Sequence, residues 1–229
     1  MMMRFRALLG LLALVPPLAL ADETRRVYRE RDGDAEIVHR FTFELTGQHK
    51  VIRLESETPA GAIFQTYHVD DQLATLAWDY DAPLAQTKVR AERHGSEIRL
   101  HGVHEGDPIS KRFEVGDQLW NQVFHIGMEP FVRGVGTATR FHAIGTKGRG
   151  DMKIASFNFK KLAQESKSVA GRELALARYQ ISLTGLLSLF WKGHYWYRRS
   201  DGRFVLYRQK GKERERDPVM VLIAEEPAS

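Results

Sequence analysis

The sequence contains no cysteine among its 229 residues. This absence excludes disulfide bonds and thiolate metal sites, which exported proteins use when their cores are insufficient. Stability must therefore come from the packed core. A chain of this length can bury about 70% of the surface that it exposes when unfolded, so one large domain can fold without a cross-link.

Long hydrophobic runs are also absent, because none reaches the roughly 18 residues of a membrane-spanning helix. The longest, from Ala7 to Leu20, is broken by Pro16 and Pro17. It follows a short basic start and ends at small residues, which is the pattern of a cleavable signal peptide. An uncleaved membrane anchor is the alternative, and the short, broken run disfavours it. We expect residues 1–21 to be removed and residues 22–229 to form a soluble periplasmic protein.

The excess of positive charge is small. The formal net charge is +5, and loss of Arg4 and Arg6 with the leader lowers it to +3. An anionic membrane surface or lipid head group would suit such a charge, which identifies no partner more specifically.

Motifs of the common enzyme classes are missing from the sequence. It contains no Gly-x-Ser-x-Gly elbow, no Walker loop, no dinucleotide-binding glycine turn and no His-Glu-x-x-His pair. The adjacent carboxylates Asp70 and Asp71 fall in a predicted turn and would not share one face as an acid/base pair. The sequence therefore predicts no catalytic residue, no cofactor and no metal.

Alternation of apolar and polar residues is the dominant pattern, and it is typical of half-buried strands. It occurs in the residue ranges 36–45, 74–80, 97–101, 109–115 and 175–183. Glycine, asparagine and aspartate stand between these ranges at short intervals, as tight turns require. We predict one all-β or β-dominated domain of about ten or more antiparallel strands, in a strongly curved sheet or half-open barrel.

One segment departs from this alternation. From Leu119 to Gly136 the chain is apolar and aromatic without a sustained period of two. We predict that it forms a short helix or packed loop over the concave face of the sheet.

His101 and His104 form the densest polar cluster with Glu105 and Asp107. Strand residues three apart point to opposite faces, so outward-facing residues explain the cluster better than a metal site does. If the protein were an enzyme, its polar residues would have to converge only in the folded chain, and His101, His104, His125 and His142 would be the first candidates.

The stretch from Trp191 to Arg208 is a predicted hairpin that interleaves aromatic and basic residues. Such interleaving can bind nucleic acid, but export argues against that partner. An ordinary hairpin with snorkelling basic side chains is one interpretation, and a ligand-lining surface is the other.

The aromatic residues of this hairpin are too many for one face of a strand. Tyr195 and Tyr197 should share one face and Trp196 should take the other. Aromatic rings with polar groups would suit an amphiphilic guest, and an arginine would suit its anionic head. Core packing is the competing explanation. The predicted ligand-binding residues are Trp120, Phe124, Trp191, Tyr195, Trp196, Tyr197, Arg198 and Arg199.

The leader, the segments Tyr67 to Gln72 and Arg93 to Gly102, and the hairpin after Phe190 together give the chain a resemblance. It is similar to uncharacterised proteins of the bacterial envelope whose fold is like that of the lipoprotein-localisation-factor class. The resemblance implies a curved antiparallel sheet that half-wraps a helix or loop and leaves an apolar concavity. The hypothesis that follows is a non-catalytic protein that binds a lipid or other apolar envelope molecule. An enzyme or a structural protein with a filled core are the alternatives.

Overall fold

The computed structural model describes residues 24–46, 49–146, 151–185, 188, 191–209 and 219–227. The predicted leader, residues 1–21, lies outside the described residues, so its cleavage stays a prediction. In the described part of the chain, no helix is long and apolar enough to cross a bilayer.

The strands of the described residues form one sheet of 15 strands, which is not closed into a barrel. Its order is β8-β7-β6-β5-β4-β3-β2-β1-β15-β14-β13-β12-β11-β10-β9. Strands β1 and β15 come from opposite ends of the described chain and pair antiparallel in the middle of the sheet. The predicted β-dominated, curved antiparallel sheet is therefore confirmed.

The first half of the sheet is a meander with short turns, as the pattern between Lys88 and Val115 predicts. A 3-10 turn, η1 (Pro83–Ala85), links the fifth strand to the sixth. The strands of this half are β1 (Thr24–Asp32), β2 (Ala35–Thr46), β3 (His49–Thr58), β4 (Gly61–Val69), β5 (Thr75–Ala82), β6 (Thr87–His94), β7 (Glu97–His104) and β8 (Asp107–Glu114).

The second half contains longer and less regular strands. The pairing of β11 with β12 shifts between Lys161 and Ala163, which marks a bulge. Strand β9 is a two-residue edge that runs parallel to β10. The strands are β9 (Leu119–Trp120), β10 (Ala138–Thr146), β11 (Met152–Val169), β12 (Arg172–Leu183), β13 (Lys192–Arg198), β14 (Phe204–Gln209) and β15 (Val219–Pro227).

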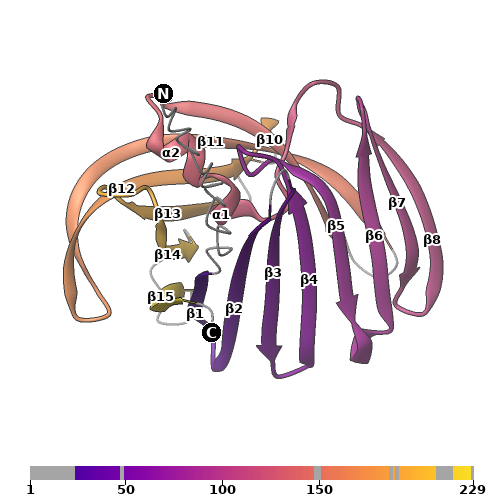
Figure 1. Cartoon of the computed structure of the whole chain (residues 1–229), viewed down its shortest axis with the longest axis horizontal. Helices are drawn as coiled ribbons and strands as arrows, with labels where there is room; N and C mark the ends of the chain where they lie inside the picture. The colour runs from indigo at the N-terminus through magenta and orange to yellow at the C-terminus, as the bar shows by residue number, and fades with distance from the viewer. Residues whose placement is uncertain are drawn as a thin grey trace, which may run out of the picture.

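Two short helices, α1 (Phe124–Gly127) and α2 (Glu129–Arg133), lie inside the curve of the sheet (Figure 1). They belong to the segment from Leu119 to Gly136, which therefore covers the concave face as predicted. Ile126 and Met128 are fully buried there, because this segment has an apolar surface that only the sheet can shield.

The main core fills the space between the concave face and the two helices. Its rings come from strands across the sheet and from the covering segment, and they include Tyr28, Phe41, Trp120, Phe159 and Tyr197. A second, smaller cluster lies on the opposite face of β13 and gathers Val169, Leu176, Trp196, Val205 and Leu206.

Candidate functional site

A pocket of about 310 Å³ lies between the concave face and α1. Its walls come from β2, β3 and β4 on one side and from β13, β14 and β15 on the other. The apolar part of the lining consists of Phe41, Leu54, Val123, Phe124 and Met220. The volume is at the lower end of the range for small-molecule sites, which is about 300–1,000 Å³.

The polar part of the lining contains no lysine, arginine, aspartate or glutamate. It consists of His39, His125, Gln65, Gln122 and the tyrosines Tyr67, Tyr195 and Tyr207. Burial raises the pKa of Tyr67 and of Tyr195 above the usual range, so both phenols are neutral near pH 7. The pocket therefore offers apolar contacts together with phenol, amide and imidazole groups.

His39 is held by two residues from the neighbouring strands. Its Nδ1 lies 2.8 Å from Ser56 Oγ, and its Nε2 lies 2.8 Å from Glu30 Oε2. The pairing of β2 with β1 and β3 brings the three side chains to one face. Both ring nitrogens of His39 are thus occupied by residues of the wall.

His125 is the other histidine of the pocket, and its environment differs. Its ring packs against Phe204 at 4.3 Å and against Phe41 at 5.8 Å between ring centres. Burial lowers the pKa of His125 to about 3, and the nearby His39 and Arg26 act in the same direction. Its Nε2 is shielded from solvent and has no hydrogen-bond partner among the described residues. The imidazole is neutral, and one of its polar atoms is unused.

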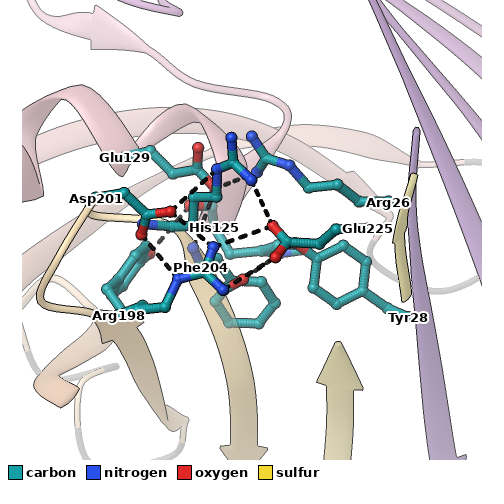
Figure 2. Close-up of polar contacts among 10 residues, drawn as sticks. Arg26, Tyr28, His125, Glu129, Arg198, Asp201, Phe204 and Glu225 are labelled. Atoms are coloured by element: carbon teal, nitrogen blue, oxygen red, sulfur yellow. Dashed lines mark hydrogen bonds and ion pairs between the residues drawn. The ribbon is translucent and has the colours of Figure 1, made fainter. Parts of the chain in front are cut away.

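A buried ion pair fixes the covering segment to the sheet (Figure 2). Arg26 Nη1 of β1 lies 2.5 Å from Glu129 Oε1 of α2, and the Phe204 N–H donates to the same oxygen at 3.0 Å. Burial raises the pKa of Glu129, while the attraction of Arg26 opposes the rise. Breaking such a pair leaves an uncompensated charge in the core, so the pair constrains where α2 lies.

A tyrosine hydroxyl adds to the attachment, because Tyr197 of β13 donates to the His125 carbonyl at 3.0 Å. The Tyr28 hydroxyl of β1 donates to the Phe204 carbonyl of β14 at 3.1 Å, within the sheet. The turn between β13 and β14 also approaches α2 closely, because a Cβ at Gly202, whose φ is +71°, would lie 2.5 Å from Arg133 Cγ. These contacts hold His125 at the pocket wall.

Of the predicted ligand-binding residues, Phe124 and Tyr195 line this pocket. Trp120 is fully buried in the core, where its indole donates to Gln122 Oε1 at 3.2 Å. Trp191 is partly buried against Phe157. Tyr197 is fully buried and attaches α1 rather than lining the pocket.

Trp196, Arg198 and Arg199 are not among the residues that line the concave pocket. Trp196 faces the other side of β13, because successive strand residues alternate, and there it donates a hydrogen bond to Glu165. The Arg198 guanidinium is paired with Asp201 at 2.6 Å and with Glu225 at 2.9 Å (Figure 2). Arg199 is exposed at the turn.

The four histidines named as enzyme candidates do not converge. His101 is exposed, His104 is buried near Thr87 on the other face of β7, and His142 contacts Ser156 at 3.0 Å. Of these four histidines, His125 is the one that lines the pocket. Within the described residues, no group of three or more histidine, aspartate or glutamate side chains could hold a metal ion.

A second hollow, of about 660 Å³, lies over β4 to β7. Its charged residues neutralise one another: Arg90 binds Asp79 at 2.7 Å, and Lys88 lies 3.1 Å from Asp81. Because these charges are already paired and exposed, the concave pocket is the stronger candidate site.

Comparison of the sequence with protein-family models and with curated proteins gives no match. The resemblance to the lipoprotein-localisation-factor class therefore stays a prediction, and the site must be interpreted from its geometry.

Proposed function

We propose that the protein is a non-catalytic binding protein that holds a lipid, acyl chain or other small apolar envelope molecule in the concave pocket. The observation that carries the proposal is the lining of the pocket, which is apolar and aromatic, has no fully charged side chain, and is covered by a firmly attached segment. Concave, largely apolar pockets with a few polar groups are the usual form of small-molecule sites.

Native mass spectrometry of the protein purified from its own host tests this proposal. We expect a bound small molecule that is released on unfolding. A Val123→Trp variant would fill the pocket, so it should lose the molecule while an exposed control, Val135→Trp, keeps it. A wild-type protein that never carries a ligand, and takes up none offered to it, would contradict the proposal.

Export to the bacterial periplasm is part of the same proposal, and the leader pattern supports it. Mass spectrometry of the host protein should find Asp22 as the first residue. An intact Met1 on a cytoplasmic protein would contradict this assignment.

Ester hydrolysis is a second candidate, and the chain of contacts from Ser56 through His39 to Glu30 favours it. A hydroxyl, a base and an orienting carboxylate within hydrogen-bond reach form the general arrangement of an activated nucleophile. Against it, Ser56 is only 4% exposed and lies within a strand that is paired on both sides. Labelling by a fluorophosphonate probe that is lost in Ser56→Ala, together with turnover of a p-nitrophenyl ester, would support hydrolysis. Absence of labelling and of turnover would contradict it.

A further inference from the structure

The polar groups of the concave pocket differ in whether they are already used. Gln65 Oε1 accepts from the Tyr67 hydroxyl at 2.6 Å and from the Trp78 indole at 3.0 Å. Gln122 donates to the Ile144 carbonyl and accepts from the Ile144 N–H, both at 2.8 Å. The Gln65 oxygen and both polar atoms of the Gln122 amide are thus occupied by the wall.

His125 differs from these two amide oxygens. Its Nε2 is buried and has no partner, and aromatic neighbours on several sides restrict rotation of the ring. A buried polar atom without a partner is destabilising unless another molecule satisfies it. The side chain that would be satisfied by a ligand therefore belongs to the covering segment.

A charged ligand group would find no compensation at this position. The pocket has no lysine, arginine, aspartate or glutamate in its lining. The charges closest to the lining already have partners: Glu30 contacts His39 Nε2 at 2.8 Å, Arg26 is bound to Glu129, and Arg198 is paired with Asp201 and Glu225. Removing an ion from water without a partner costs far more than removing a neutral polar group.

We infer that the pocket selects uncharged amphiphiles, with an apolar body among the aromatic residues and a hydroxyl group on Nε2 of His125. A hydroxyl both donates and accepts, so it fits either neutral tautomer of the imidazole. The inference rests on the proposed binding function and specifies its ligand class. An uncharged hydroxyl group thus takes the place of the anionic head group that the sequence prediction assigned to an arginine.

A probe series of constant chain length tests the selection. Octane, 1-octanol, octanoate and octylammonium are titrated into the wild-type protein at pH 8, where both ions are charged. We expect 1-octanol to bind at least tenfold more tightly than either ion. Binding of octanoate or octylammonium as tightly as 1-octanol would overturn the inference while the binding function stood. Failure of all four, octane included, would contradict the binding function itself and the inference with it.

A substitution then tests the role of His125. His125→Phe retains an aromatic ring and removes Nε2, so 1-octanol should bind about tenfold more weakly while octane binds unchanged. His101→Phe, an exposed residue remote from this pocket, is the matched control and should alter neither probe. Equal 1-octanol affinity in His125→Phe and wild type would overturn the assignment of the hydroxyl site. If His125→Phe does not fold, His125→Gln applies the same comparison of 1-octanol with octane.

Discussion

The two faces of strand β13 carry aromatic side chains in very different surroundings. Tyr195 and Tyr197 join the main core on the concave side, whereas Trp196 joins the small cluster on the opposite side. The main core includes polar attachments to the covering segment, such as the Tyr197 hydroxyl on the His125 carbonyl. In the small cluster, the Trp196 indole donates a hydrogen bond to Glu165, and the Lys167 ammonium lies 5.5 Å from the centre of the Trp196 ring.

The difference shows how one strand can serve two purposes. On the concave side, polar groups position the pocket wall as well as stabilising the fold. On the opposite side, packing joins neighbouring strands and does not reach the pocket. Substitutions on the concave side should therefore alter both stability and ligand binding, and those at the small cluster should alter stability alone.

The largest effect is expected at the buried ion pair. Glu129→Leu leaves the Arg26 guanidinium unpaired in the core and should lower the free energy of unfolding by about 3–5 kcal/mol, measured by urea denaturation. Adding Arg26→Met to the same chain should restore most of the loss, because the double variant buries no charge. A single variant as stable as wild type would show that the pair does not constrain α2.

Trp196→Ala should cost about 3 kcal/mol in the same measurement, since it empties a buried aromatic site. Binding of the pocket ligand should be unchanged at concentrations of urea where the variant is folded. If Trp196→Ala lost the ligand while its urea unfolding midpoint stayed unchanged, Trp196 would be a ligand-binding residue and not a core residue.

The pH dependence of stability should depend on His125. Its pKa is about 3 in the folded protein and about 6.5 when unfolded, so between these values the unfolded chain binds the extra proton. Stability should fall as pH falls, by about 2 kcal/mol from pH 7 to pH 5. His125→Phe should remove that part of the slope, and urea denaturation at both pH values measures it. Parallel slopes in the two proteins would refute the neutral histidine.

Tyr197→Phe should have the smallest effect, about 1 kcal/mol, because it removes one hydrogen bond and keeps the ring. Tyr179→Phe is the control, since Tyr179 packs in the same core but its hydroxyl bonds to no described residue. Equal unfolding midpoints for the two variants would show that the bond to His125 adds no stability.

Much of the fold could be predicted from the sequence because strand alternation and turn chemistry are local. The hairpin after Trp191 and the opposite faces of Tyr195 and Trp196 follow from the period of two alone. Strand β11 was not predicted, and its bulge at Lys161 to Ala163 shifts the alternation partway along its length. A single register error in such a strand exchanges its two faces.

The pocket was harder to predict because its walls depend on pairing between distant parts of the chain. Strand β1 lies between β2 and β15, and this order brings Met220 near His39 and Phe41. No local pattern reveals it. The unused Nε2 of His125 and the contacts of His39 depend on the same arrangement. The sequence named His125 only as one of four histidines to consider in an enzyme, because its partners lie on distant strands.

The two outer edges of the sheet approach each other through side chains rather than through a backbone ladder. Lys111 of β8 bonds to Asp151 at 2.5 Å and to the Met152 carbonyl at 2.9 Å, at the start of β11. Next to the short edge strand β9, the Gln122 N–H donates to the Thr75 hydroxyl of β5 at 2.9 Å. The apolar residues of the main core pack between the same two sides. In the described part of the chain, the unclosed sheet thus depends on side chains, and not on main-chain pairing, to join its two edges.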